Sequence, residues 1–403
     1  MGDKQHHTLY NAALILFLLA YLALGAFSLY WLAVLTPRHP IGSDFRIYYQ
    51  AYMDAQAGDN PYLPYDIGTS YVYHPFALTF LSLFSPGDNN QVTALRFWIT
   101  AGVVAWIGVV WLVVRLLRSD FWGKDTPFVA DSRMLGGCVL LFLGFGPLWE
   151  TLHTGQINTF VVVFLYLSFY LAEKRHEEAA GLFLALAIVL KTSPLIFIAY
   201  FFVFRRYRVV FSTLISLGLL TLVPLVQFLP RVIWDFVHIL PLMGTAIHAT
   251  PYNQSVLSLV FRLVKSLGYA DWGPTLIWGH KVIFAGLLAL LFGGGWLARG
   301  ETKALRFWVF TTLVALMVFF SPLVWYHHSV FLLLPLAALL LHRSRVYGVV
   351  GLSLLSLIQL DRVFEHFVMR AGVPVLLAQG VLIGVLLGMS FAEWRGLNDV
   401  RRA

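Results

Sequence analysis

The sequence predicts an all-α protein that crosses a membrane many times, and three observations lead to this prediction. Of the 403 residues, 59% are hydrophobic and only 12% are charged, whereas a soluble domain carries about 25% charged residues. Apolar runs of membrane-spanning length recur from end to end. The short alternating segments of a membrane β-barrel are not found in it. We attribute the net charge of +8 to basic loops between apolar runs rather than to nucleic-acid binding.

We predict about twelve spanning helices within one membrane domain, residues 1–403. The first apolar run is too long for the core of a signal peptide, so we expect it to remain as an anchor. The apolar segment 75–84 is too short to cross and is expected at the interface. The single cysteine, Cys138, excludes a disulfide within the chain. The predicted spans lie near residues 10–36, 92–117, 134–150, 157–172, 177–190, 193–204, 208–230, 280–298, 304–322, 326–341, 345–360 and 373–392.

The basic residues predict how the chain is oriented. With the N-terminus in the cytoplasm, most of the 28 lysines and arginines fall in cytoplasmic loops, including the clusters RRYR (205–208) and HRSR (342–345), as the positive-inside rule expects. If segment 75–84 spanned the bilayer, this bias would reverse. We therefore expect a multi-pass protein of the inner or plasma membrane. Its long extracytoplasmic loops, 37–91 and 231–279, would carry additional short helices.

Polar residues that are unusual in such a chain gather on the extracytoplasmic side in this topology. Lys191 follows the apolar run LALAIVL, so it either snorkels to the interface or meets an anion. Arg262 is a second cation, and it could equally lie on a solvated helix face. We expect the remaining members of the group to contribute to a substrate site. They are Asp44, Arg46, Tyr48, Tyr49, Glu150, His153, Gln156, Asn158, Asn253, Gln254, His327 and His328.

Several of these residues also have a purely structural interpretation. Asp44 could cap the helix that follows it, and the tyrosines after it suit either the membrane interface or a sugar platform. The neutral amides could pack helices or bind sugar hydroxyls. The spacing of Glu150 and His153, with the pair His327 and His328, matches no metal-binding motif, so we expect no metal and no other cofactor.

Seven short motifs occur in an order that resembles glycosyltransferase family 87, within the GT-C superfamily of membrane glycosyltransferases. They are SDFRIYYQAY (43–52), GDNPY (58–62), YVYHP (71–75), GQIN (155–158), LALAIVLKTSPLIF (184–197), NQS (253–255) and SPLVWYHH (321–328). The family includes polyprenol-phosphate-mannose-dependent mannosyltransferases and related arabinosyltransferases. The resemblance implies a GT-C-type fold, a cavity at the outer membrane surface and a polyprenyl-phosphate-sugar donor. It also implies a catalytic base at Asp44. His74 stands before Pro75 where the family often has a second proline, which could alter the acceptor side.

The residue types support the same chemistry by a separate route. Nucleotide sugars stay in the cytoplasm, whereas a sugar on a lipid phosphate can arrive from within the bilayer. A leaving phosphate needs cationic or hydrogen-bonding partners, which Lys191, Arg262, His327 and His328 could supply. One carboxylate suffices as the base of an inverting displacement.

We therefore predict transfer of a sugar, with mannose as the first choice and arabinose as the second, to a glycolipid or cell-envelope glycan. A transporter or flippase for lipid-linked sugars is the alternative, although the cytoplasmic half of the spans is nearly all apolar. A non-catalytic membrane scaffold is the third possibility, in which no single polar residue would matter.

Overall fold

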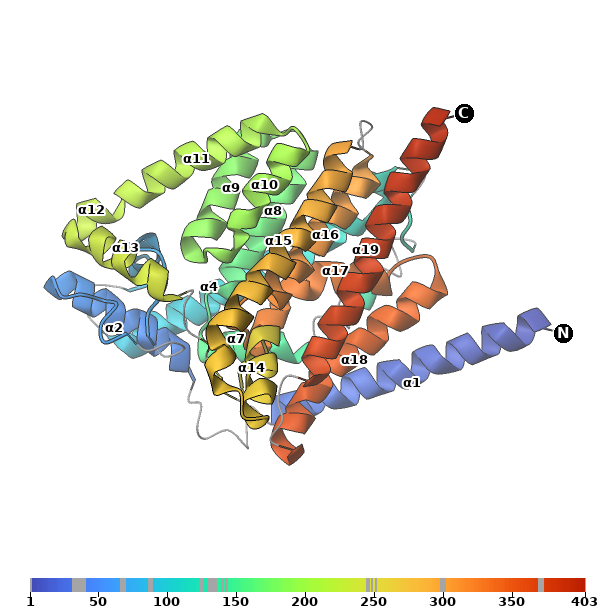
Figure 1. Ribbon diagram of the computed structural model, residues 1–403, viewed down its shortest axis with the longest axis horizontal. Helices are drawn as coiled ribbons and strands as arrows, with labels where there is room; N and C mark the ends of the chain where they lie inside the picture. The colour runs from blue at the N-terminus through green and yellow to red at the C-terminus, as the bar shows by residue number, and fades with distance from the viewer. Residues whose placement is uncertain are drawn as a thin grey trace.

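The computed structural model describes residues 2–30, 41–65, 70–85, 90–123, 126–129, 136–138, 141, 144–243, 247, 249–250, 252–297, 302–368 and 373–402. Across these ranges the regular structure is helical, apart from one isolated bridge between Phe128 and His342 (Figure 1). The short helices are α2 (Ser43–Ala57), α3 (Phe76–Ser82), α5 (Ser119–Trp122), α7 (Gly146–Thr154), η2 (Ser193–Leu195), α12 (Pro224–Gln227), α13 (Arg231–Met243), α14 (Val256–Ser266), η3 (Ala270–Trp272) and η4 (Tyr326–Leu332). The helices of the bundle are α1 (Gly2–Tyr30), α4 (Gln91–Leu117), α8 (Asn158–Glu173), α9 (Glu177–Leu190), α10 (Ile196–Val203), α11 (Tyr207–Leu222), α15 (Gly273–Leu297), α16 (Lys303–Phe319), α17 (Leu333–Leu340), α18 (Arg345–Val368) and α19 (Val373–Arg402).

Five helical stretches among the described residues are long and apolar enough to cross a membrane. They are Gln91–Leu117, Tyr207–Gln227, Gly273–Gly294, Arg345–Val363 and Val373–Gly396. Shorter apolar helices occupy Ile15–Tyr30, Asn158–Glu173, Ser193–Val203 and Tyr326–Leu340. The prediction of an all-α membrane protein is therefore confirmed. The count of about twelve spans, the GT-C-type arrangement and the single domain over 1–403 stay predictions.

Two predicted segments differ from the helices found. The predicted span 134–150 lies partly outside the described residues, and its last residues begin the separate nine-residue helix α7. Segment 75–84 becomes α3, which has seven residues and is about 10 Å long at 1.5 Å per residue. That length is far below the hydrocarbon thickness of about 30 Å. The start of the predicted loop 37–91, residues 37–40, lies outside the described residues.

The helix α9 packs side by side with α8 and with α11 (Figure 1). It runs antiparallel to α8 and parallel to α11, because α10 returns the chain between α9 and α11. Gly181 of α9 makes the packing against α11 possible, because a Cβ atom there would lie 2.5 Å from the Cβ of Ser212. Small residues at such crossings let helix backbones approach closely. Because α8 has 16 residues, its two ends lie about 24 Å apart. The start of α8 and the end of α9 therefore share one end of the bundle, which carries the polar residues discussed below.

Ion pairs hold the opposite end of these helices. Arg306 binds Glu173 through two nitrogens, with N–O distances of 2.6 and 2.7 Å. Arg206 binds Glu177 at 3.0 Å and lies 3.7 Å from Glu173. Buried arginines are tolerated when several carboxylate oxygens accept their donors. The basic turn residues Arg175 and Arg205, and Arg208 in the first turn of α11, lie at this same end.

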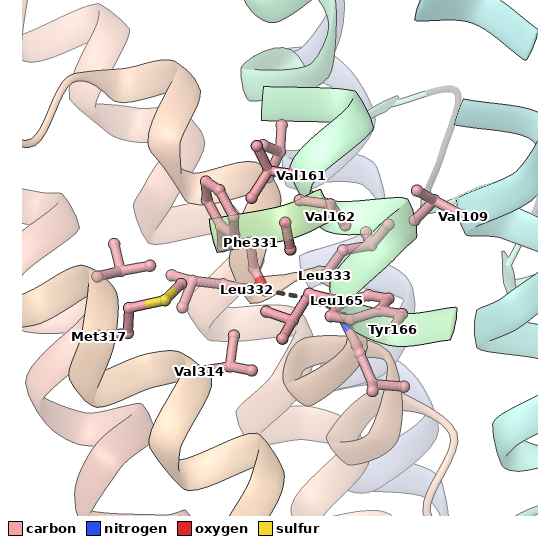
Figure 2. Packing of buried hydrophobic residues seen from close by; sticks show 14 of the residues in the cluster. Val109, Val161, Val162, Leu165, Tyr166, Val314, Met317, Phe331, Leu332 and Leu333 are labelled. Atoms are coloured by element: carbon pink, nitrogen blue, oxygen red, sulfur yellow. Dashed lines mark hydrogen bonds between the residues drawn. The ribbon is translucent and has the colours of Figure 1, made fainter. Parts of the chain in front are cut away.

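A buried apolar cluster packs against η4. Figure 2 shows Val161, Val162 and Leu165 of α8 packed near Phe331 and Leu332. The hydroxyl of Tyr166 donates to the carbonyl of Phe331 at 2.7 Å and accepts from the amide of Leu334 at 3.0 Å. The change from the 3-10 helix η4 to α17 interrupts the regular backbone hydrogen bonds here. The hydroxyl of Tyr166 serves as the partner of the carbonyl and the amide at this change. The position of η4 is thus fixed by side chains of α8.

Candidate functional site

A cavity of about 1100 Å³ lies at the polar end of the bundle. Apolar side chains on its wall come mainly from α9, α11, α13, α15 and α16. Polar side chains come from α2, α7, η4 and α18, from the turns that follow α7 and α9, and from the segments before α3 and α14. The apolar group includes Ile188, Leu217, Leu240, Phe284, Met317 and Phe320. The polar group includes Asp44, Tyr48, Tyr73, His74, Glu150, His153, Gln156, Lys191, Gln254, His327, His328 and Arg362. The cavity is therefore amphipathic, with a wall that suits both a lipid chain and a polar head.

Asp44 stands in the first turn of α2 and points to a glutamine rather than to its own helix end. The N-cap residue of α2 is Gly42, with no side-chain cap, so the capping interpretation of Asp44 is wrong. Instead, Nε2 of Gln156 donates to Oδ2 of Asp44 in a very short contact. The other end of that amide accepts from the hydroxyl of Tyr48 at 2.8 Å. The Tyr48 hydroxyl also lies 3.0 Å from that of Tyr73, so a chain of hydrogen bonds fixes the carboxylate.

The turn at Gly155 places Gln156 beside Asp44, although Gln156 and Asp44 are 112 positions apart in the sequence. Its φ of +72° is left-handed, and a Cβ atom would lie 2.7 Å from the Cβ of Phe45. Glycine therefore fits here on both grounds. The amide of Gly42 donates to the carbonyl of His153 at 2.8 Å, and Nε1 of Trp98 donates to the carbonyl of Gly155 at 2.8 Å. These bonds lock the turn after α7 against the start of α2.

Lys191 follows the last residue of α9, and its ammonium group reaches into the cavity wall. Its Nζ donates to Oδ1 of Asn158 at 2.9 Å and lies 2.8 Å from Nε2 of His328. The ring of Phe331 lies 5.7 Å from the nitrogen. Asp44 is near enough to interact electrostatically with Lys191. The lysine is therefore held inside the protein rather than extended toward an interface.

The two histidines of η4 face the cavity from a different direction. Nδ1 of His327 lies 3.3 Å from Oε1 of Glu150, and the other oxygen of Glu150 is in direct contact with the guanidinium of Arg362. That guanidinium also lies over the ring of Tyr326, 4.2 Å from its centroid. Nδ1 of His328 accepts from the backbone amide of Trp325 at 3.1 Å. Three elements, α7, η4 and α18, thus meet in one charged network.

His74 lies on the cavity wall and also joins two elements. Its Nδ1 accepts from the amide of Phe76 at 3.1 Å, and its Nε2 lies 3.3 Å from the hydroxyl of Thr221 in α11. The ring of Phe236 packs against it at 5.1 Å. Burial lowers the pKa of His74 from its usual 6.5 to about 4, because the charged form loses its hydration. His74 is therefore neutral in the folded protein near pH 7.

Other predicted site residues lie beside the cavity rather than on its wall. Asn253 is buried, and its side chain bonds the backbone of Pro322 at 3.1 Å and of Val324 at 3.0 Å. Arg46 is exposed, and Tyr49 is buried against the rings of Phe45 and Tyr52. Asn158 acts on the site through Lys191.

Arg262 is also displaced from the cavity wall. It is partly buried on α14, where Asp361 is near enough to interact with it electrostatically. Nε2 of Gln254 donates to Asp361 in a very short contact. This connection ties the segment before α14 to α18.

Tyr73 and Arg362 are among the residues of the cavity wall that sequence reasoning did not single out. Tyr73 lies within the quoted motif YVYHP, but nothing marked it apart from its neighbours. Arg362 and Asp361 end the otherwise apolar run VYGVVGLSLLSLIQL. Charged residues at a span end are costly unless paired, so this pair carried a signal that could have found it.

Fold and site together define the class of this molecule, a helical membrane protein with a large amphipathic cavity at one end of its bundle. The chain matches the model of glycosyltransferase family 87 over residues 71–322. The match covers more than half of the chain, so the protein belongs to this family, as the motifs predicted. Lys191 and Glu150 lie inside the matched region, whereas Asp44 precedes it and His327 and His328 follow shortly after its end.

A relative from Mycobacterium tuberculosis is named polyprenol-phosphate-mannose-dependent alpha-(1-2)-phosphatidylinositol mannoside mannosyltransferase. It is 26% identical over 281 residues, which are 67% of this chain and 62% of the relative. The chain thus matches less than two thirds of the relative's length. The donor and acceptor in this name are those of the relative.

Proposed function

We propose that this protein is a glycosyltransferase that moves a sugar from a polyprenyl-phosphate donor to a hydroxyl of a glycolipid or cell-envelope glycan. Mannose is the first choice for the sugar, and arabinose is the second. The observation that carries this proposal is one cavity whose wall combines a carboxylate, a lysine and a large apolar surface. Family membership and the relative's name support it.

The apolar part of the wall suits the polyprenyl chain of the donor. Leu217 of α11, Leu240 of α13 and Phe284 of α15 contribute to this surface. Burying apolar area is worth about 25 cal/mol per Å², so a long lipid chain would contribute much of the binding free energy. The donor could then enter from the bilayer, its second partner, without passing through water.

Lys191 and His328 are the proposed partners of the donor phosphate. Their nitrogens lie 2.8 Å apart, so one phosphate oxygen can lie within reach of both. As the bond to the sugar breaks, negative charge develops on the phosphate, and fixed cationic and N–H groups stabilise it. Arg262 is a weaker choice than the sequence suggested, because its place beside Asp361 lies off the cavity wall.

Asp44 is the proposed base. Its carboxylate would accept the proton of the acceptor hydroxyl while that oxygen forms a bond to the anomeric carbon. The bond between this carbon and the phosphate oxygen breaks, and polyprenyl phosphate leaves with the electron pair. Attack from the face opposite the phosphate inverts the anomeric configuration. Gln156 supports this role because its amide holds the carboxylate in place.

The cavity would face the extracytoplasmic side of the cell membrane. The reason is the charge at the other end of the bundle, where Arg175, Arg205 and Arg206 lie in the turns after α8 and α10 and Arg208 lies in the first turn of α11. The positive-inside rule places such an end in the cytoplasm. A donor that is held by the membrane rather than dissolved in the cytoplasm agrees with this orientation.

The experiment that tests the proposal incubates the purified protein with polyprenyl-phosphate mannose, polyprenyl-phosphate arabinose or their glucose counterpart, together with a lipid extract of the membrane. Mass spectrometry then reads the products. We expect a new glycolipid with one of the first two donors and none with Asp44→Asn. Movement of a donor across vesicle bilayers with no product formed would favour the flippase instead.

A further inference from the structure

Two consecutive histidines, His327 and His328, line the same cavity, yet the structure treats them differently. Both are buried, and their rings are nearly perpendicular, at 88° with centroids 4.8 Å apart. In each ring Nδ1 contacts a protein group, Glu150 for His327 and the amide of Trp325 for His328. Nε2 of His328 lies against Lys191, and Nε2 of His327 is buried without a hydrogen-bond partner among the described residues. A neutral imidazole carries its proton on one nitrogen and accepts with the other. The partner of Nδ1 therefore decides whether Nε2 is a hydrogen-bond donor or acceptor.

For His327 the engaged nitrogen is a donor. Its Nδ1 faces the carboxylate of Glu150 at 3.3 Å, and Glu150 is in contact with Arg362. An arginine stays charged inside proteins, so it keeps the carboxylate ionised, and an ionised carboxylate can only accept. Nδ1 must then carry the proton. Nε2 keeps its lone pair, and it has no hydrogen-bond partner within the part of the chain that the structure describes.

A second proton on His327 is disfavoured by the charges around it. The cavity wall already holds Lys191 and Arg362 against Asp44 and Glu150, so its charges are balanced. A further buried cation would lose its hydration without an unmatched anion to replace it.

For His328 the engaged nitrogen is an acceptor. Its Nδ1 receives the amide proton of Trp325 at 3.1 Å, so the proton of the neutral ring resides on Nε2. That N–H points toward Lys191, whose nitrogen lies 2.8 Å away. An ammonium group and an N–H are both donors, so a single anionic oxygen is the partner that satisfies the two at once.

We propose that the histidine pair presents opposite hydrogen-bonding faces, with His328 donating to the phosphate while His327 accepts from a hydroxyl of the transferred sugar. This inference rests on the proposed function and deepens it. The sugar is the occupant because it is bonded directly to the phosphate, and His327 adjoins the phosphate-facing ring. Glu150 and Arg362 are positioning residues, which set the tautomer of His327. The assignment removes His327 from the phosphate-binding group that the sequence predicted.

The test measures the dissociation constants of donors that each lack one sugar hydroxyl, so that binding is separated from turnover. A neutral hydrogen bond contributes about 0.5–1.5 kcal/mol, which corresponds to about 2- to 12-fold in affinity. We expect one deoxy donor to bind the wild-type protein more weakly by that factor. His327→Leu should bind this deoxy donor and the complete donor with equal affinity. His327→Gln, which places an acceptor oxygen near the position of Nε2, should again bind the complete donor more tightly than the deoxy donor.

The tautomer has its own readout in the imidazole nitrogen NMR shifts of protein labelled at histidine, with His327→Gln identifying the signal. Glu150→Gln offers an amide N–H to Nδ1, so the proton should move to Nε2, whereas Arg362→Lys keeps the charge and should preserve the original tautomer. His176→Gln, at an exposed turn of the opposite end, is the matched control for removing a histidine.

The outcomes separate this inference from the proposed function. A protein that binds no polyprenyl-phosphate sugar overturns the function itself. If the wild type binds the donor and His327→Leu still binds the deoxy donor more weakly than the complete donor, only the assignment of His327 is wrong. A wild-type His327 signal with the proton on Nε2 overturns it as well.

Discussion

Replacing Asp44 by asparagine should abolish sugar transfer while the protein stays folded. The change keeps the size of the side chain and one acceptor oxygen. It removes no helix cap, since the N-cap of α2 is Gly42. The amide of Gln156 can still donate to the remaining oxygen. What disappears is the basic carboxylate.

The two effects of this change differ in size. A hydrogen bond to a charged group contributes about 1.5–3 kcal/mol and one between neutral groups about 0.5–1.5 kcal/mol, so the stability loss should be about 1 kcal/mol. A positioned general base contributes roughly 10²- to 10⁴-fold in rate, which is about 3–5 kcal/mol of barrier. A stability loss of about 1 kcal/mol is a small part of the roughly 5–15 kcal/mol that holds a typical protein folded. It would therefore not account for a rate loss of that size.

The assay compares initial rates of product formation, donor affinity and thermal unfolding in detergent. Asp54→Asn is the matched control, because Asp54 lies on the same helix and binds Gln50 at an exposed site. We expect Asp54→Asn to retain wild-type rates within a factor of two. If Asp44→Asn transfers sugar at more than a tenth of the wild-type rate, the base is another group. Glu150 would not replace it easily, because Arg362 already occupies that carboxylate.

Three further predictions concern orientation, stability and pH. Cys138 is 1% exposed, so an impermeant thiol reagent should label Asp59→Cys in intact cells but neither the wild type nor Arg175→Cys, and the reverse pattern would place the cavity in the cytoplasm. Arg306→Gln should lower the unfolding free energy by about 1.5–3 kcal/mol, the size of hydrogen bonds to a charged group, because both bonds to Glu173 are lost while Arg206, 3.7 Å away, still compensates part of its charge. The double variant with Glu173→Gln should recover part of the loss, measured by denaturant-induced unfolding. Burial lowers the pKa of His74 to about 4, so the unfolded chain takes up a proton below pH 6.5 and stability falls as pH drops from 7 toward 4. Between pH 7 and 5 the loss should be on the order of 1–2 kcal/mol, and His74→Asn should flatten that part of the thermal-stability profile.

Much of the helical framework could be predicted because apolar length is a local property. The predicted spans 92–117 and 177–190 coincide with α4 and α9 to within a residue. Ends that depend on tertiary contacts were less accurate. The helix α15 begins seven residues before the predicted 280, and α19 continues ten residues past 392. At the end of α19 the polar residues after 392 extend a helix that hydropathy alone would end.

The choice of site residues on α2 shows what helical periodicity could have added. Asp44 and Tyr48 are four residues apart and share the face toward the cavity. Arg46 and Tyr49 lie off that face, one exposed and the other buried against aromatic rings. These neighbours were predicted as one group because they share one short motif, SDFRIYYQAY. Once residues 43–57 are a helix, the 3.6-residue period separates them.

Contacts between distant parts of the chain could not be predicted from one sequence. The carboxylate of Glu150 meets His327, 177 positions away, and Asp44 meets Gln156 over 112 positions. The cost of an unpaired charge in a membrane predicts that a partner exists, and it does not say which one. This limit explains why Lys191 was recognised as unusual while its contacts with Asn158 and His328 were not.

The ion pairs of the cavity divide its four charged side chains into separate duties. Arg362 is in contact with Glu150 and lies over the ring of Tyr326, so its charge is already matched. Lys191 donates to the amide oxygen of Asn158 and lies beside the imidazole of His328, and both of these groups are neutral. A donor phosphate that enters this cavity therefore meets the lysine, because displacing Glu150 from Arg362 would leave a carboxylate buried without a counterion. We expect the same division to make Glu150 unsuited to proton transfer, which supports the proposal of Asp44 as the base, since its carboxylate is held by the neutral amide of Gln156.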